Sequence, residues 1–483
     1  MGVLEGLEPA AVFHFFEEIC GIPHGSGNEK RLSDHLKQFA GQRGLECIQD
    51  EAGNIIIIKE AAPGYEAEET MILQGHMDMV AVKDADCDLD LRTEGLRLQR
   101  EGDYIFAAGT SLGGDDGIAV AYILAVLDDK TIEHPRLECV ITVGEEVGMD
   151  GARVLDLSVL KGKRMLNLDN EEEGILLTSC AGGVRADIRL PVSYEEQSGT
   201  LLSIQVSGLA GGHSGAEIIR GGGNANCLMG QVLDAILQQM DVNAASLEGG
   251  MADNAIPAQA QALLCVAQKD VERACAIIRD MEEKFRKELA VKDAGVRINV
   301  SVEKQAGACV CLSKESMRKA TALLLAAPNG IQAMSADVEG LVETSLNLGV
   351  MKLNKEALEL SFAVRSSLES AKEAVCRRLC AVSELAGAGI TFHGDYPGWA
   401  YRQESPLREM MIRVYERMYG QKPRIEAIHA GLECGIFSGK LPELDCISFG
   451  PDMKDVHTPK EALCISSVKN VWEYLLEVLK QKD

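Results

Sequence analysis

Short apolar runs alternate with helical patterns over the first 180 residues of the chain. The stretches 9–20 and 29–42 space their apolar residues as one face of a helix does, and 116–129 is apolar enough to be a buried helix. Four runs have the length and composition of strands that are covered on both faces: 54–58, 70–75, 137–143 and 164–168. This alternation predicts an α/β layer architecture.

The pattern changes near residue 184. In "LLSIQVSGL" (201–209) apolar and polar residues alternate, which predicts a strand with one exposed face, and a helical pattern follows at 224–240. Further strands are expected at 257–267, 296–302, 345–352, 357–364 and 389–393, and further helices at 271–290, 314–327 and 369–385. This order predicts an α+β domain with antiparallel strands and helices on one face, and two ferredoxin-like halves are one arrangement compatible with it.

The α/β pattern returns near residue 400. Three elements are expected there: helices at 405–419 and 466–480, and an apolar strand at 444–450. We therefore expect a mixed-sheet α/β domain formed by 1–183 and 400–483, with the α+β domain, 184–399, inserted into it. A chain of 483 residues is too long for one ordinary core, which agrees with two domains.

Composition and net charge limit the partners and the cellular compartment that we expect for the chain. The net charge of −26 disfavours nucleic acid and anionic membranes as partners. No apolar run approaches the roughly 20 residues that span a bilayer, and the acidic N-terminus lacks the basic region of a secretory signal. The 15 cysteines are odd in number and lie mostly in apolar segments, so we expect reduced thiols in a cytoplasmic protein. Cys309 and Cys311 form one tight pair, which a strand with both on one face explains.

Residues that can bind metal follow the apolar runs of the first domain. They are His76 and Asp78 after 70–75, Glu145 and Glu146 after 137–143, Asp169 after 164–168, and His457 after 444–450. The turn "GTSLGGDDG" adds Asp115 and Asp116 at the start of a helix. In open α/β sheets ligands bind beyond the carboxyl ends of the strands. One His-x-Asp pair would be an ordinary surface feature. Residues of these types after several different strands together predict a metal-binding site.

The donor types favour particular metals. Imidazole and carboxylate without thiolate suit zinc, manganese or cobalt, and two ions need about six to eight ligands. So many carboxylates would repel one another unless cations neutralised them. Asp78 lies on the same side of an extended chain as His76 and can hydrogen-bond its second ring nitrogen. Glu145 and Glu146 point in different directions, so that one can bind metal while the other acts as a base on water.

The motifs that hold these residues resemble those of a known family. "GHMDMV", "GGDDG", "EEVGMDG", "LDNEEEG" and "VHTP" are similar to the motifs of the co-catalytic dizinc exopeptidases, which include carboxypeptidase G, aminoacylases and carnosinases. Within that family, "IPHGSGNEKRL", "GGHSGAEI", "VETSLNLGV" and "HAGLECGIF" resemble segments of the bacterial aminoacyl-histidine dipeptidases, in the same order. The resemblance covers essentially the whole chain.

The resemblance implies a role for each metal-site residue. It gives the ligands as His76 and Asp169 at one metal, Glu146 and His457 at the other, and Asp115 as the bridge between them. Glu145 is then the general base, and Asp78 orients His76. Asp116 stands where the aminoacyl-histidine dipeptidases carry asparagine, which adds charge beside the bridge and bears on the metal preference.

The resemblance also implies roles for residues of the inserted domain, which corresponds to the family's lid. His213 in "GGHSG" matches the imidazole that stabilises the oxyanion, and dimeric relatives supply this residue to the partner subunit. Asn254 and Arg365 of this domain, and His429 of the segment 400–483, match lid or cleft positions that hold the substrate's termini. A homodimer is therefore compatible with the sequence.

The resemblance implies metal-dependent hydrolysis of dipeptides with a free N-terminus, with Xaa-His dipeptides, including β-alanyl-histidine, as expected substrates. Two divalent ions are the expected cofactors, zinc first and cobalt or manganese as alternatives. Two other functions stay open: an amidohydrolase of N-acyl amino acids on the same fold, and an inactive metal or peptide binder. Retention of Glu145 argues against the binder, which has no use for a second carboxylate there.

Overall fold

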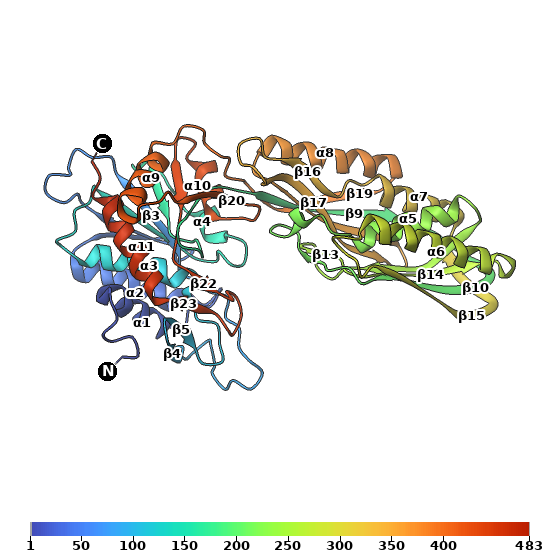
Figure 1. Ribbon diagram of the computed structural model, residues 1–483, viewed down its shortest axis with the longest axis horizontal. Coiled ribbons are helices and arrows are strands. Elements are labelled where there is room, and N and C mark those ends of the chain that lie inside the picture. The colour runs from blue at the N-terminus through green and yellow to red at the C-terminus, as the bar shows by residue number, and fades with distance from the viewer. Residues whose placement is uncertain (1, 483) are drawn as a thin grey trace. The chain divides into compact units, whose positions relative to one another are not determined.

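The computed structural model describes residues 2–482, with the backbone alone at 304–306. The chain forms two compact units (Figure 1). The first unit comprises Met1–Ser179, Trp399–Ala427 and Leu432–Asp483, and the second comprises Cys180–Gly398 and Ile428–Gly431. Residues 428–431 belong to the second unit although the chain on either side of them belongs to the first, and the hydrophobic pattern does not predict this. No helix within the described residues is long and apolar enough to cross a membrane.

The first unit is built on a mixed eight-stranded sheet, with strands in the order β1-β2-β6-β3-β7-β21-β8-β20. The strands are β1 (Glu46–Gln49), β2 (Ile55–Lys59), β3 (Met71–His76), β6 (Leu137–Thr142), β7 (Arg164–Asn167), β8 (Ile175–Cys180), β20 (Arg424–Ile428) and β21 (Asp445–Ser448). The central strands β6, β3, β7 and β21 are parallel, and β3 and β6 are buried along their whole length. Their carboxyl ends therefore meet at one edge of the sheet.

Helices cover this sheet. They are α1 (Ala10–Cys20), α2 (Lys30–Arg43), α3 (Gly114–Asp128), α4 (Asp150–Val154), α9 (Pro406–Tyr419), α10 (Glu433–Lys440) and α11 (Ile465–Leu479). In α3, which packs against β3 and α1, residues 114–127 are all buried, and each large aliphatic side chain contributes about 1.5–3 kcal/mol. Helix α9 starts where Pro406 follows Ser405, whose hydroxyl accepts a hydrogen bond from the Arg408 amide at 3.0 Å.

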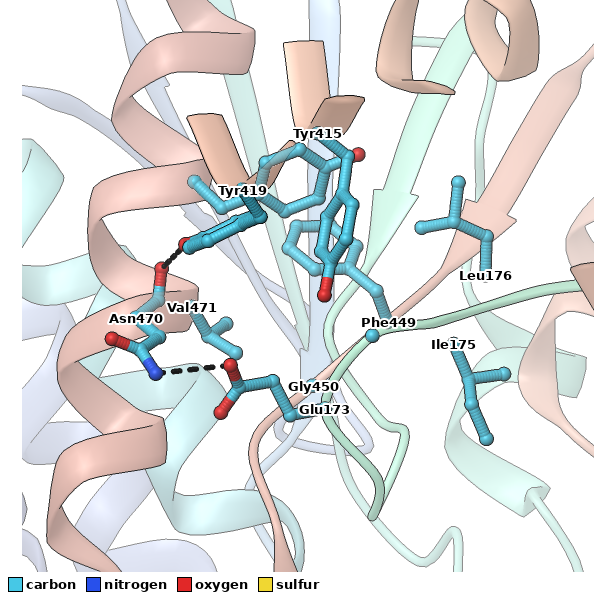
Figure 2. A pocket seen from close by; sticks show the side chains of 11 residues that line it. Glu173, Ile175, Leu176, Tyr415, Tyr419, Phe449, Gly450, Asn470 and Val471 are labelled. Carbon is cyan, nitrogen blue, oxygen red and sulfur yellow. Dashed lines mark hydrogen bonds between the residues drawn. The ribbon is translucent and has the colours of Figure 1, made fainter. Parts of the chain in front are cut away.

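Aromatic side chains of α9 and α11 pack around a small pocket (Figure 2). The rings of Tyr415 and Tyr474 meet edge to face at 5.3 Å. The Tyr419 hydroxyl donates to the Asn470 carbonyl at 2.9 Å, and the Asn470 amide donates to Glu173 at 3.0 Å. The pocket holds about 10 Å³, room for about one water molecule. It is therefore a packing feature and too small for a dipeptide.

A four-stranded sheet accompanies the main one in the first unit. It has the order β22-β23-β5-β4, with β22 (Met453–Lys454), β23 (Ala462–Cys464), β5 (Tyr104–Ala107) and β4 (Leu98–Glu101). The turn from β22 to β23 carries His457, whose backbone is left-handed with φ 64°. This conformation is uncommon for a residue other than glycine and is often found at functional sites.

The second unit is built on a nine-stranded antiparallel sheet, in the order β15-β10-β14-β12-β17-β18-β9-β19 with β16 (Gly330–Met334) beside β17. The other strands are β9 (Gly182–Pro191), β10 (Tyr194–Ser207), β12 (Val242–Gly249), β14 (Ala260–Val266), β15 (Arg297–Leu312), β17 (Val342–Leu353), β18 (Ala357–Ser366) and β19 (Gly389–Tyr396). A separate pair joins β11 (Gly212–His213) to β13 (Ala255–Ile256).

The strand order shows two ferredoxin-like halves. The helices of the unit are α5 (Ala225–Leu237), α6 (Val271–Glu288), α7 (Lys314–Ala326) and α8 (Glu369–Ala386), and Figure 1 shows them on one side of the strands. One half runs β10-α5-β12-β14-α6-β15, and the other runs β9, then α7-β17-β18-α8-β19. Each half has the spatial strand order 4-1-3-2, and the first is inserted after the opening strand of the second.

Two expected strands of the second unit differ from the structure. The strand expected at 296–302 continues to Leu312, because β15 pairs with β10 as far as the Tyr194–Leu312 pair. The strand expected at 257–267 is β14, which begins three residues later, at Ala260, and ends at Val266. Pro257, which has no backbone N–H to donate, lies between the end of β13 and the start of β14.

Candidate metal centre

His76 and Asp78 stand at the carboxyl end of β3, and both are buried. His76 Nδ1 lies 3.0 Å from the Asp78 main-chain carbonyl and 3.5 Å from the Asp78 carboxylate. That carboxylate accepts hydrogen bonds from the Ser26 hydroxyl at 2.8 Å and from the amides of Glu145 and Glu146 at 3.0 and 3.3 Å. Asp78 therefore fixes both the imidazole and the turn that follows β6.

Asp115, in the first turn of α3, lies between two imidazoles. Its Oδ1 is 3.1 Å from His76 Nε2, and its Oδ2 is 3.1 Å from His457 Nε2. His76 Nε2 is also 3.7 Å from Asp169, and His457 Nε2 is 2.8 Å from Glu146. A carboxylate with each oxygen directed at a different imidazole has the geometry of a bridge between two metal ions.

The donor atoms of the site form three overlapping groups, each within 4.8 Å. The groups are His76, Asp116 and Asp169; His76, Glu145 and Glu146; and Asp115, Glu146 and His457. Each of the five expected ligands belongs to at least one of them. Imidazole nitrogens and carboxylate oxygens in this proportion fit divalent ions such as zinc, manganese or cobalt.

The electrostatics of the site call for positive charge. Burial raises the pKa of Glu145 well above its ordinary value, that of Asp169 to about 6 and that of Glu171 to about 7. Hydrogen bonds first to Asp115 and then to Glu146 raise the pKa of His457 to about 11. The carboxyl groups of Glu145, Asp169 and Glu171 thus tend to hold protons, which divalent cations would replace.

Asp116 adds a fully buried carboxyl group next to Asp115. Its Oδ2 accepts a hydrogen bond from the His76 amide at 3.2 Å, while Oδ1 has no hydrogen-bond partner among the described residues. Burial, and next the charge of Asp169, raise its pKa well above the ordinary value. A Cβ on Gly75 would lie 2.6 Å from the Asp116 carboxylate, so glycine at 75 makes room for it.

Glu461 supports the turn that carries Asp115, and sequence reasoning missed it. Its buried carboxylate accepts from the amides of Leu112, Gly113 and Gly114 at 2.8, 3.1 and 2.7 Å, and the Asp115 amide lies 3.4 Å away. In the sequence, Glu461 could be recognised only as an acidic residue four positions after His457, next to an apolar strand. A single such residue has no periodic pattern to mark it.

Glu433 is a second buried acid that sequence reasoning missed. It opens α10 and accepts hydrogen bonds from Gln74 at 2.5 Å and from Thr142 at 2.6 Å. The Asn167 amide continues this network by donating to Gln74 at 2.6 Å. Burial raises the pKa of Glu433 to about 8. These polar residues tie together β3, β6 and β7 just before the metal-site residues.

In the second unit, His213 presents a neutral imidazole. The amides of Gly215 and Ala216 donate to its Nδ1 at 3.3 and 3.2 Å, which leaves the proton on Nε2. Burial, and next the charge of Arg365, lower its pKa. Nε2 lies 3.5 Å from Arg365 Nη2, and since both atoms carry protons in this tautomer, the approach is a contact and not a hydrogen bond. His213 is therefore a hydrogen-bond donor held in place by its own loop.

The remaining substrate-binding candidates lie near His213 within the second unit. Arg365 donates to the Tyr396 hydroxyl at 3.3 Å, and its buried Nε has no partner among the described residues. His429 Nε2 is 2.7 Å from the Ser345 hydroxyl, and burial and then Arg365 lower its pKa to about 3. Asn254 is exposed, and its carbonyl accepts from the Ser214 amide at 2.8 Å.

Known proteins resemble the chain over its full length. It is 36% identical, over 484 residues, to the cytosol non-specific dipeptidase of Escherichia coli (strain K12), covering 100% of this chain and 99% of that protein. The crystal structure of aminoacylhistidine dipeptidase from Vibrio alginolyticus superposes with a TM-score of 0.93 at 36% identity, covering 99% and 98% of the two chains. Aminopeptidase PepT from Bacillus cereus ATCC 10987 shares the fold, with a TM-score of 0.56, 15% identity and 98% of each chain covered.

The family model described as peptidase family M20/M25/M40 matches residues 72–481. The matched range contains all the candidate metal ligands described above, from His76 to His457. By this match and by its full-length relatives, the chain belongs to peptidase family M20/M25/M40.

Proposed function

We propose that the protein is a dinuclear metallo-dipeptidase that cleaves dipeptides with a free N-terminus. The observation that carries the proposal is the Asp115 carboxylate between the imidazoles of His76 and His457, with Glu145 in an overlapping donor group. Family membership supplies peptide-bond hydrolysis, and the two relatives that are 36% identical to the chain are dipeptidases by name.

The proposed ligands are His76 and Asp169 for one ion, Glu146 and His457 for the other, and Asp115 for both. Zinc is the proposed metal, with cobalt or manganese as alternatives. When bound, the two cations polarise the scissile carbonyl and make water easier to deprotonate. The His76–Asp115 and His457–Asp115 contacts show that this chain already directs the donor atoms toward one another.

Glu145 is the proposed general base. It takes a proton from the attacking water and returns it to the leaving amine, so that no net proton is lost. Asp78 positions it by accepting the Glu145 amide hydrogen bond. His213, with its proton on Nε2, is the proposed donor to the oxyanion, an interaction commonly worth about 3–4 kcal/mol.

Xaa-His dipeptides, including β-alanyl-histidine, are the proposed substrates. The similarity to an aminoacylhistidine dipeptidase supports this preference, whereas the name of the Escherichia coli relative describes a broader one. Arg365, with an unpartnered guanidinium nitrogen, is proposed to bind the substrate's carboxylate, and Asn254 and His429 to hold its termini. A cytoplasmic location and a homodimer complete the proposal.

A dipeptide panel tests the proposal directly. Enzyme reconstituted with zinc, cobalt or manganese should cleave Xaa-His dipeptides and leave the N-acetylated form of the same dipeptide intact. Preferential cleavage of the N-acetylated compound would instead identify an amidohydrolase. Binding of dipeptides without cleavage under every metal would identify an inactive binder, and either result would refute the proposal.

A further inference from the structure

Three cysteines that the proposed reaction does not use meet in the second unit. Cys309 Sγ on β15 lies 2.8 Å from Cys265 Sγ on β14 and 3.6 Å from Cys311 Sγ. The three sulfur atoms all lie within 4.8 Å of one another. The sequence showed only the Cys309–Cys311 pair, because Cys265 is 44 residues away along the chain.

A glycine in the intervening strand allows the three thiols to meet. Strand β10 lies between β14 and β15, where Leu201 pairs with Cys265 and Gln197 pairs with Cys309 (Figure 1). Between these positions β10 carries Gly199 and an irregular register. A Cβ on Gly199 would lie 2.6 Å from Cys265 Sγ. A side chain there would separate the sulfur atoms, so the contact depends on this glycine.

The thiols lie outside the main hydrophobic cluster of the second unit. The chain neighbours Leu264, Val266 and Leu312 belong to the core cluster of the second unit, whereas Cys265 and Cys311 are buried outside it. Because side chains alternate between the faces of a strand, the cysteines point away from the helix-covered face. Their closest described side-chain partners are one another.

We propose that Cys265, Cys309 and Cys311 form a three-sulfur binding site for a thiophilic d10 cation, with Cu(I) as the best match. Soft thiolate ligands select Cu(I), whereas zinc in structural sites takes four ligands. A metal–sulfur distance of about 2.3 Å places three coplanar sulfur atoms about 4 Å apart. The separations of 2.8 and 3.6 Å are shorter than this value, so the proposal requires the sulfur atoms to move apart as the cation enters.

Binding to this site is coupled to proton release. Burial, and next the contact with Cys309, raise the pKa of Cys265 to about 11 and that of Cys311 further above its ordinary value. The Cys265 and Cys311 thiols are therefore protonated at neutral pH, and a bound cation displaces their protons, so affinity increases with pH. Entry is open at Cys309, which is half-buried on β15, the edge strand of the sheet.

The test uses the full-length protein, reduced and kept free of oxygen, titrated with Cu(I) against a chromogenic Cu(I) chelator. We expect one equivalent to bind with a sulfur-to-copper charge-transfer band in the ultraviolet. The nitrogen and oxygen donors around Asp115 cannot produce that band. The variant with Cys265, Cys309 and Cys311 all changed to Ser should lose both the band and the bound equivalent.

The matched control changes Cys275, Cys376 and Cys380 to Ser. These three half-buried thiols lie elsewhere in the same unit, and this variant should bind Cu(I) as the wild type does. The single change Cys309→Ser, at the most accessible thiol, should lose the band as well and guards against misfolding of the triple variant. Dipeptide cleavage by both variants reports that they are folded.

Two results would overturn the proposal. One is a wild-type protein that shows no charge-transfer band, or a band that survives in the triple variant. The other is a stable Cys265–Cys309 disulfide in the isolated protein, seen as two thiols that react only after reduction and absent from Cys309→Ser. That outcome would replace metal binding with a structural cross-link.

Discussion

Burial and catalysis act in opposite directions on the carboxyl group of Glu145. Burial raises its pKa well above the ordinary value, so that the isolated group would hold its proton. A general base must be ionised before it can accept a proton from water. The proposed cations reconcile the two, because positive charge beside Glu145 lowers its pKa towards the range in which a base works at neutral pH.

The substitution Glu145→Gln separates metal binding from proton transfer. The amide is nearly isosteric with the carboxylate but cannot accept the proton, so kcat should fall by about 10²–10⁴-fold with both metal equivalents retained. Steady-state kinetics with metal analysis on the same sample measure both quantities. Glu51→Gln, at an exposed turn residue, is the control and should behave as wild type. A Glu145→Gln enzyme with more than about a tenth of wild-type kcat would show that another group is the base.

The raised pKa of Glu433 predicts that the free energy of unfolding depends on pH. Its pKa in the folded protein is about 8, above the ordinary value of 4.5. Its stabilising contribution is therefore fully present below about pH 4.5 and is lost as the pH rises through about 8. Each unit of this difference corresponds to about 1.4 kcal/mol.

In Glu433→Gln this titration is absent. Between about pH 5 and about pH 9 the denaturant midpoint of the metal-free variant should fall less than that of the wild type. Parallel denaturation curves across this range measure the difference, and Glu51→Gln again serves as control. If wild type and Glu433→Gln lost stability in parallel, Glu433 would not titrate in this range.

At the scale of elements, the proposed metal centre depends on where the strands and turns of the first unit end. Strands β3, β6 and β7 deliver His76, Glu146 and Asp169 to one edge of the sheet, since parallel strands end together. Asp115 instead comes from a turn at the start of α3, which is a weaker anchor than a buried strand. Four amide contacts to Glu461 hold that turn.

Removing the Glu461 carboxylate should loosen the turn that carries Asp115. Partners that orient a metal ligand typically contribute 10–100-fold to metal affinity, so Glu461→Ala should weaken metal binding by about that factor. Competition with a chelator measures the affinity, and excess metal should restore most of kcat. Glu473→Ala, at an exposed position of α11, is the control. An unchanged metal affinity in Glu461→Ala would show that α3 holds Asp115 unaided.

The sequence predicted the elements that have a clear hydrophobic pattern. It did not predict elements and contacts that depend on pairing between distant strands. The run 70–75 appears as β3 and 116–129 as the larger part of α3. Strand β12 was not predicted, because apolar and polar residues do not alternate cleanly in "VNAASLEG". The strand forms by pairing with its neighbours in the sheet. Cys265 meets Cys309 only through an irregular register, which no periodicity encodes. Long-range pairing of this kind is decided by the fold and not by local pattern.

At the scale of the whole molecule, the proposal requires both units for one reaction. The base and the metal ligands belong to the first unit, and His213 and Arg365 belong to the second. His213→Ala should lower kcat by about 10²–10³-fold, as loss of an oxyanion donor does elsewhere, with the metal content unchanged. His393→Ala removes an exposed imidazole of the same unit and is the control. Wild-type kcat in His213→Ala would remove His213 from the mechanism.

Complementation decides whether His213 serves its own chain or a partner chain. If His213 acts on another copy of this chain, mixing His213→Ala with Glu145→Gln chains creates some sites with both groups intact. Activity should then recover to a fraction of the wild-type value, after subunit exchange that is verified with differently tagged chains. If His213 acts within its own chain, no mixture restores activity, because each chain lacks one essential group. Dilution of the wild-type protein to concentrations at which the oligomer dissociates gives an independent test. If a partner chain supplies His213, the measured kcat should fall on dilution.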